Sequence, residues 1–449
     1  MTRNGQFSEE SRQIVHVSMG SLALLLRYLS SWQAVVLAGG AVAFNLYALP
    51  RLAGRLYRPG EVRRRLRSGI VLYPLAVLLL IVLFPDRRDI IAAAWGVLAF
   101  GDGMATLVGR RSSGPRIPWN REKSVAGSVA FIACGGTAAS FLCWWCRLAV
   151  IPPPYPWFTL WMPWAAAIIA AAVETIPIKL DDNMSVPAVA SATLWFTSLI
   201  SEDLAAATTT HGLRVLPLAL LANGVVAALG YAGRTVTMPG AICGAAIGSI
   251  IVITAGWGGW GLLLATFMVA VVSSRLGLRK KTLLGIAEAR GGRRGAGNAI
   301  ANTGVAAVAA TLGALTYAHD AGRVAFVAAL AAGGSDTVAS EIGKAWGRRT
   351  ILVPTFVPVP PGTSGAISAE GTAAGLIAAF ALAAVGSAFA LVPLIMIPVV
   401  VVAATIGSFA ESVLGATLEG PGIVNNDVLN FVNTAIAGGV AVALAGALQ

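Results

Sequence analysis

Two stretches of the chain each place one aspartate in an otherwise apolar segment. Asp102 is followed seven residues later by Gly109, and Asp336 is followed seven residues later by Gly343, so both pairs share one offset (336 − 102 = 343 − 109 = 234). A carboxylate inside a membrane segment is energetically costly, so it marks a candidate functional site. The shared offset predicts a duplicated unit with one candidate site in each copy.

The residues after each aspartate indicate metal and phosphate chemistry. Asp102 and Thr106 are four residues apart, as are Asp336 and Ser340, so each pair shares one face of a helix. A carboxylate beside a hydroxyl suits Mg²⁺ that is shared with phosphate groups. We expect Asp102 and Asp336 to be metal ligands, with Glu341 as a further one. An ion pair with a neighbouring helix is the alternative.

A second element begins the next apolar segment of each copy. Three positions align at one offset of 244 (368 − 124 = 244): Ser124, Gly127 and Ser128 with Ser368, Gly371 and Thr372. Hydroxyls and glycines at a helix start, where backbone N–H groups are free, form a cradle for anions. Lys123 adds a positive charge for phosphate oxygens. Ordinary helix capping is the alternative.

A third element is a buried acid followed by a polar return to the membrane. Glu174 precedes Asp182 and Asn183, and Glu411 precedes Asn426. We expect these side chains to complete the metal site or to position the attacking hydroxyl group. A solvated loop is the alternative for the residues that follow each glutamate.

A fourth element lies near the N-terminus, where Arg12 and His16 are four residues apart and share a helix face. We expect His16 to act in catalysis and Arg12 to bind phosphate, although a lone histidine is often structural. The remaining candidate phosphate-binding residues are basic or hydroxyl side chains close to these motifs: Arg110, Arg121, Ser335, Lys344, Thr363 and Ser364.

The composition predicts an all-α polytopic membrane protein. The 449 residues are 57% hydrophobic and 12% charged, whereas soluble domains have about 25% charged residues. The formal net charge is +12, but the basic residues lie in loops, as the positive-inside bias of cytoplasmic loops predicts. Nucleic-acid binding is not expected, because the sequence shows no water-exposed basic domain. The polar N-terminus shows no cleavage site typical of a signal peptide.

The apolar pattern predicts about fifteen transmembrane helices, with the N-terminus inside and both candidate sites on the cytoplasmic face. The predicted spans are 14–30, 31–50, 68–85, 89–109, 124–150, 157–176, 185–200, 213–232, 239–256, 257–274, 297–318, 322–343, 367–388, 391–408 and 428–447. A direct repeat of seven spans needs one extra span to restore its orientation. We therefore expect domains at 1–205 and 234–449, joined by a linker helix at 206–233.

The first half, about residues 9–200, resembles the phytol kinase and dolichol kinase group of CTP-dependent polyprenol kinases. The resemblance rests on four stretches: Glu10, Arg12, His16 and Gly20; Gly101, Asp102, Ala105, Gly109 and Arg110; Asn120, Lys123, Ser124, Gly127 and Ser128; Asp182, Asn183 and Pro187. The group is distantly similar to phosphatidate cytidylyltransferase. That enzyme's terminal pattern is replaced here by Lys179-Leu-Asp-Asp-Asn, which disfavours nucleotidyl transfer.

The second half, about residues 234–449, is similar to the transmembrane protein 19 family, which includes phytyl-phosphate kinase. The similarity rests on Gly285 to Glu288, Gly292 to Gly295, Gly334 to Lys344 and Pro361 to Gly365. One departure is the segment Asn298 to Gly304, which replaces an expected Gln and Asn-Gly.

Together the resemblances imply a bifunctional isoprenoid kinase in a bacterial-type inner membrane. It would phosphorylate a prenyl alcohol of the phytol or geranylgeraniol type to the monophosphate and then to the diphosphate, with CTP as donor and Mg²⁺ as cofactor. Phosphoryl transfer needs mainly positioned charge and metal, which these residues offer. The alternatives are a lipid cytidylyltransferase, a transporter with a parallel repeat, and a degenerate second unit that acts as a scaffold. The sequence does not specify an oligomeric state.

Overall fold

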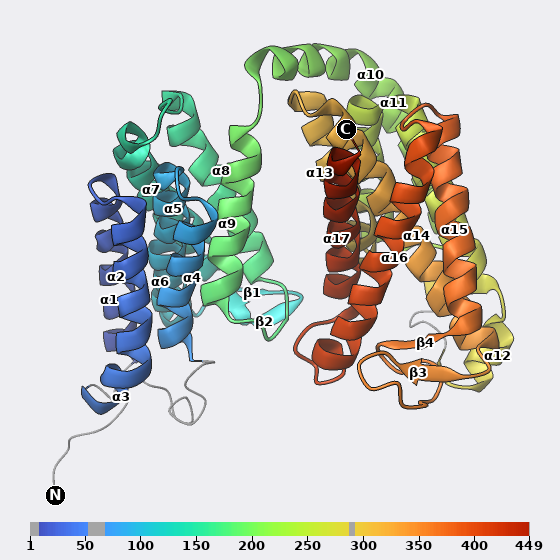
Figure 1. Ribbon diagram of the computed structural model, residues 1–449, viewed down its shortest axis with the longest axis horizontal. Helices are drawn as coiled ribbons and strands as arrows, with labels where there is room; N and C mark the ends of the chain where they lie inside the picture. The colour runs from blue at the N-terminus through green and yellow to red at the C-terminus, as the bar shows by residue number, and fades with distance from the viewer. Residues whose placement is uncertain (1–8, 53–67, 287–291, 449) are drawn as a thin grey trace, which may run out of the picture. The chain divides into compact units, whose positions relative to one another are not determined.

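The computed structural model describes residues 9–52, 68–286 and 292–448 (Figure 1). The loop between the predicted spans 31–50 and 68–85 lies largely outside these residues, as do Ala287 and Glu288 of the second resemblance. The predicted all-α fold is confirmed, because the structure is 79% helical and the described residues contain four short strands. The chain divides into two compact units, Met1–Leu199 and Ile200–Gln449.

Unit 1 is a bundle of helices that run side by side (Figure 1). Its elements are α1 (Glu9–Met19), η1 (Gly20–Arg27), α2 (Ser31–Ala43), η2 (Phe44–Ala48), α3 (Leu49–Leu52), α4 (Gly69–Leu83), α5 (Arg88–Gly96), η5 (Val97–Asp102), α6 (Gly103–Arg111), β1 (Arg116–Ile117), β2 (Asn120–Ser124), α7 (Val125–Cys146), η6 (Arg147–Ala149), α8 (Pro156–Glu174) and α9 (Asp182–Ser198). The segments α5, η5 and α6 follow one another without a break and contain Asp102.

Unit 2 is a second helical bundle. Its elements are α10 (Glu202–Ala232), α11 (Met238–Arg275), α12 (Leu278–Leu283), α13 (Ala296–Leu315), α14 (His319–Trp346), β3 (Thr350–Leu352), β4 (Ala366–Ser368), α15 (Ala369–Ala388), η8 (Leu394–Met396), α16 (Ile397–Leu414), η9 (Gly415–Glu419) and α17 (Asn426–Ala447). Helix α14 contains Asp336 and packs against α11, α13, α15, α16 and α17.

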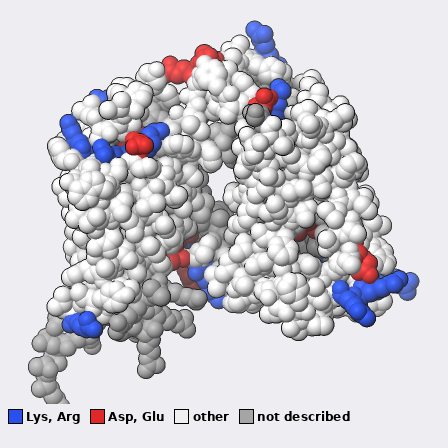
Figure 2. All heavy atoms as spheres, in the orientation of Figure 1, with Lys and Arg blue, Asp and Glu red and all other residues white. Residues whose placement is uncertain are grey.

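Ten helices in the described part of the chain are long and apolar enough to cross a membrane. The count of fifteen spans stays a prediction. The predicted spans 239–256 and 257–274 both lie within the segment labelled α11, which consists of two helices that meet at Gly256, where the backbone is non-helical with φ +69°. Figure 2 shows that most of the visible surface carries no charged side chain, and that charges gather mainly near helix ends.

The core of each unit surrounds the helix that carries the aspartate. In unit 1, Ile90, Ala93 and Leu98 are fully buried, and in unit 2 Leu330 and Ala332 are also fully buried. Small residues allow neighbouring backbones to approach closely in membrane bundles. The aspartates therefore lie on helices that run through the buried core of each bundle.

Two short antiparallel hairpins interrupt the helices, and the sequence did not predict them. Strands β1 and β2 pair before α7, and strands β3 and β4 pair before α15. In each case the second strand ends on a serine that caps the helix after it, Ser124 or Ser368. The hairpins therefore fix the start of the two helices that were expected to bind phosphate.

Candidate active site

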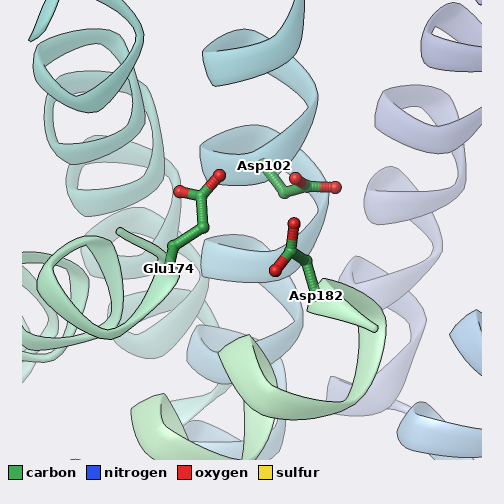
Figure 3. A group of neighbouring side chains, drawn as sticks. All are labelled: Asp102, Glu174 and Asp182. Carbon is green, nitrogen blue, oxygen red and sulfur yellow. The ribbon is translucent and has the colours of Figure 1, made fainter. Parts of the chain in front are cut away.

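Three carboxylates converge in unit 1. Asp102 at the end of η5, Glu174 at the end of α8 and Asp182 at the start of α9 each place one oxygen within 4.8 Å of the others. Figure 3 shows the three side chains directed toward one another from these elements. Asp102 and Glu174 are buried, and Asp182 is half-buried. The structure thus brings together three of the predicted catalytic residues.

Lys123 neutralises part of this cluster from the side of the β1–β2 hairpin. Its Nζ lies 2.5 Å from Glu174 Oε1 and 3.0 Å from Asp182 Oδ2. Burial alone would lower the pKa of Lys123, but the Glu174 and Asp182 carboxylates raise this pKa above its usual range. The lysine is therefore charged at neutral pH and lies beside the cluster before any substrate binds.

The hairpin is fastened to the end of α8 by two hydrogen bonds. Trp119 Nε1 donates to Thr175 Oγ1 at 3.1 Å, and Asn120 Nδ2 donates to the Thr175 carbonyl oxygen at 3.2 Å. Thr175 follows Glu174 directly, so these bonds set the distance between Lys123 and its partner. Trp119 was not among the predicted site residues, because its contact depends on a loop fold that the sequence pattern does not specify.

His16 lies at the edge of the acid cluster. Its Nε2 is 3.1 Å from the Leu98 carbonyl oxygen and 3.5 Å from Asp102 Oδ2. The ring also packs edge-on against Tyr73, with ring centroids 4.6 Å apart. His16 is thus placed near Asp102, although the bond to the backbone carbonyl shows that it also has a structural role.

Arg12 and Asn183 meet at the start of α4. A Cβ atom added at Gly69 would lie 2.7 Å from Arg12 Nη2 and 2.8 Å from Asn183 Nδ2. The Asn183 backbone N–H and side-chain amide both donate to Asp181 Oδ1, at 3.0 and 2.6 Å. Asn183 Oδ1 is buried and lacks a hydrogen-bond partner in the structure. Gly69 therefore gives these two predicted residues the space that they occupy.

The predicted phosphate cradle of unit 1 lies at the start of α7, where glycines allow α7 to pack closely against α6. Ser124 Oγ accepts from the Gly127 N–H at 3.1 Å, as ordinary capping predicts. A Cβ atom at Gly127 would lie 3.0 Å from the Ala105 carbonyl oxygen and 3.4 Å from Gly109 Cα, so α6 and α7 touch here. Ser128 Oγ donates to the Ser124 carbonyl oxygen at 3.4 Å.

The other predicted phosphate-binding residues of unit 1 lie around this contact. Thr106 is half-buried on α6, whereas Arg110 and Arg121 are exposed at the end of α6 and in β2. The two arginines are accessible to a ligand in water.

Unit 2 contains the same helix contact. Ser368 Oγ accepts from the Gly371 N–H at 3.1 Å, and a Cβ atom at Gly371 would lie 3.2 Å from Gly343 Cα. Ser335 is buried, and its Oγ donates to the Ala332 carbonyl oxygen at 3.1 Å. The remaining predicted residues lie nearer the surface: Ser340, Thr363 and Asn426 are exposed, and Ser364 is half-buried.

The acids of unit 2 form a pair. The Asp336 carboxyl group on α14 lies next to the Glu411 carboxyl group on α16. Asn433 on α17 is fully buried and donates from Nδ2 to Glu411 Oε2 at 2.7 Å. Its Oδ1 is buried and lacks a hydrogen-bond partner in the structure. Asn433 was not among the predicted site residues, because its only signal in the sequence is an amide inside an apolar segment.

Glu341 does not fit the predicted role of metal ligand. It is almost fully buried, and its Oε2 accepts from Lys281 Nζ, while its Oε1 accepts from Lys344 Nζ at 2.9 Å. Both oxygens are thus engaged with ammonium groups. Lys281 of α12 is fully buried, and its Nζ also donates to the Ser274 carbonyl oxygen at 2.9 Å.

The donor sets are compatible with a hard divalent cation. In unit 1 the clustered oxygens belong to Asp102, Glu174 and Asp182, and in unit 2 the Asp336 and Glu411 carboxyl groups touch. Adjacent buried carboxylates need a proton or a cation between them. Mg²⁺ takes oxygen ligands and is bound by one or two carboxylates together with substrate phosphates.

Comparisons with known proteins agree with the membrane fold. Residues 221–438 match the family described as integral membrane protein DUF92. An uncharacterized membrane protein of Synechocystis sp. is 38% identical over 208 residues, which are 45% of this chain and 80% of that protein. The chain belongs to this family of integral membrane proteins.

Two relatives carry more specific names. Protein VTE6, chloroplastic, of Arabidopsis thaliana is 38% identical over 194 residues, which are 42% of this chain and 58% of that protein. Probable phytol kinase 3, chloroplastic, of Glycine max is 30% identical over 191 residues, which are 39% of this chain and 59% of that protein. The chain therefore spans less than two thirds of the length of either. No solved structure shows a significant match.

Proposed function

We propose that the chain is a bifunctional membrane kinase for an isoprenoid alcohol, in which unit 1 makes the monophosphate and unit 2 makes the diphosphate. CTP is the proposed donor and Mg²⁺ the proposed cofactor. The observation that carries the proposal is the cluster of Asp102, Glu174 and Asp182 with Lys123 beside it, in a chain with a relative named as a phytol kinase. The proposed domains are 1–205 and 234–449, joined by 206–233.

In unit 1, the geometry suits transfer of the terminal phosphoryl group to a hydroxyl. The substrate oxygen forms a bond to the γ-phosphorus as the bond to the β,γ-bridging oxygen breaks, and the nucleoside diphosphate leaves. The hydroxyl proton passes to a carboxylate, for which Asp102 is placed next to His16. Lys123 leaves Glu174 and Asp182 and contacts the γ-phosphate. Its positive charge then balances the negative charge of that phosphate group.

When bound, Mg²⁺ would supply charge neutralisation for the donor phosphates, and Asp102 and Asp182 would hold it. The backbone N–H groups at the start of α7, beside Ser124, would donate hydrogen bonds to a phosphate oxygen at the positive end of the helix. Arg110 and Arg121 are exposed close to this point and would contact the outer phosphates of the donor.

In unit 2, Asp336 and Glu411 would have the same role in phosphoryl transfer to a monophosphate. Their contact and the recurring glycine contact at Gly343 and Gly371 support a second site with the layout of the first. The gene fusion and internal repeat implied by this layout are part of the proposal. The fusion would keep the monophosphate close to its second enzyme.

The decisive experiment uses purified protein, CTP labelled in the γ-phosphate, and a panel of prenyl alcohols and monophosphates. The proposal expects label in both the monophosphate and the diphosphate. CTP labelled in the α-phosphate is the matched control, because a cytidylyltransferase would place that label in the lipid. Absence of γ-label from every lipid would end the kinase proposal.

A further inference from the structure

An apolar cavity of about 560 Å³ lies in unit 1 beside the acid cluster. Most of its wall comes from three segments, namely α1 with η1, α2 with η2, and α4, and the rest comes from Leu29, Leu49 and Trp95. Arg12, His16 and Gly69 line one end. His16 therefore belongs both to the cavity wall and to the surroundings of Asp102, since its Nε2 is 3.5 Å from Asp102 Oδ2. The cavity thus begins where the proposed chemistry takes place.

The direction of the cavity follows from the antiparallel packing of α2 against α4. Asn45 Nδ2 donates to the Ile70 carbonyl oxygen at 2.8 Å, and Ser31 Oγ donates to the Pro85 carbonyl oxygen at 3.0 Å. The start of α4 therefore lies opposite the end of α2, and the far end of the cavity is lined by Ile81 and the residues opposite it.

The length of the cavity matches one leaflet of a bilayer. Gly69 and Ile81 both line it and are twelve residues apart (81 − 69 = 12), which is about 18 Å along a helix. One leaflet has a hydrocarbon thickness of about 15 Å. The cavity can therefore accept a hydrocarbon chain that lies along the membrane normal.

The cavity walls are suited to a chain that enters from the membrane. Leu37 is 57% exposed and Phe44 is 48% exposed, although both line the cavity. Their exposure shows that the cavity opens sideways between helices whose outer faces are apolar. A lipid can therefore enter without leaving the hydrocarbon region.

We propose that this cavity binds the hydrocarbon chain of a single-chain prenyl alcohol, with the hydroxyl group next to His16 and Asp102, and that α2 sets the chain length accepted. This inference rests on the proposed function for unit 1 and locates the binding site for the hydrocarbon chain of its substrate. The volume lies within the range of about 300–1,000 Å³ typical of small-molecule sites, so it suits one chain. Small residues on α2, including Ala38 and Gly40, leave the space that the chain fills.

Gly40 provides a direct test. It lines the cavity, and a Cβ atom added there would meet no atom within 4 Å. Phenylalanine at this position would therefore project into open space and shorten the cavity without a clash in the fold. Gly39 is the matched control, because a Cβ atom there also meets nothing within 4 Å but the residue is not part of the cavity lining.

The experiment compares Gly40→Phe with Gly39→Phe, using prenyl alcohols of two and four isoprene units. Gly40→Phe should lower kcat/KM for the four-isoprene alcohol by about tenfold or more, as expected when a pocket rejects extra hydrocarbon, and should largely spare the two-isoprene alcohol. Gly39→Phe should leave both alcohols nearly unchanged. Equal losses for both alcohols, or the same selectivity in Gly39→Phe, would overturn the assignment.

A second measurement separates this inference from the proposed function. A four-isoprene alcohol with a diazirine at its tail should cross-link to peptides of α2 and α4 in the wild-type protein, and Gly40→Phe should reduce this labelling. If neither alcohol is phosphorylated but the cross-link appears and depends on Gly40, the kinase proposal fails and the cavity assignment stands. Labelling elsewhere, or labelling that Gly40→Phe leaves unchanged, would overturn the assignment.

Discussion

The two units use their lysines in opposite ways. In unit 1, Lys123 is bound to Glu174 and Asp182 and lies within the acid cluster. In unit 2, Lys281 and Lys344 are both bound to Glu341, and Asp336 faces Glu411. The Lys123 side chain is 30% exposed beside the acid cluster, where we propose that it meets a phosphate group. In unit 2, the Lys281 side chain is 1% exposed and pairs with the buried Glu341. The lysines of the two units therefore have different carboxylate partners.

This difference suggests how the two proposed steps are divided. The acid cluster of unit 1 already contains the Lys123 ammonium group, so it can bind a negatively charged nucleotide. Its other proposed substrate, the alcohol, carries no charge. A bare carboxyl pair must be balanced by a proton or a cation before it can receive two phosphorylated substrates. Unit 2 should therefore depend more strongly on the divalent ion than unit 1.

The largest expected effect tests whether the Asp102 carboxylate accepts the hydroxyl proton of the alcohol. Asp102→Asn should lower the rate of monophosphate formation about 100- to 10,000-fold, the range expected for loss of a general base. Formation of diphosphate from added monophosphate should be nearly unchanged, because Asp336 and Glu411 remain. The measurement is label in each product. Loss of both reactions would show that the units do not act separately.

The reciprocal change is Asp336→Asn. It should make the monophosphate accumulate, with diphosphate formation lowered about 100-fold or more, and Glu411→Gln should act in the same direction. Chromatography of the labelled lipids over time is the readout. Continued diphosphate formation at the wild-type rate in both variants would indicate that unit 2 is a scaffold.

A stability measurement tests the structural role assigned to Lys281. Lys281→Met should destabilise unit 2 by about 3–5 kcal/mol, because it leaves the buried Glu341 carboxylate with one partner fewer. The adjacent Lys280 is exposed, so Lys280→Met should have little effect and is the matched control. Thermal unfolding in detergent gives the comparison. If Lys281→Met instead leaves stability unchanged and blocks only diphosphate formation, Lys281 contacts substrate. The lysines of the two units would then have the same role.

The smallest expected effect concerns the hairpin that carries Lys123. Trp119→Phe removes the hydrogen bond to Thr175, which is worth about 1 kcal/mol, so the KM for the donor should rise about fivefold. The kcat should change little, because the carboxylates remain in place. Steady-state kinetics of monophosphate formation check this, and a change confined to kcat would contradict the positioning role.

Several features followed from the sequence because they depend on local chemistry. The apolar runs predicted almost every helix, and the spacing of Asp102 from Gly109 predicted one helix face. A buried acid is energetically costly wherever it lies in a membrane. Glu174 and Glu411 could therefore be predicted as site residues from the sequence alone. The N-capping alternative for Ser124 was also open to prediction, because it requires only residues in the same helix.

The tertiary structure alone decided which charges meet. Glu341 and Lys281 are sixty residues apart, and Asn433 reaches Glu411 from another helix. These contacts depend on how whole helices rotate and pack, which hydrophobic spacing does not specify. The cavity beside His16 has the same origin, because it is a space left between three helices. The sequence by itself thus determined where the chemical groups lie along the chain, and the packing determined whether each one faces a substrate or a partner.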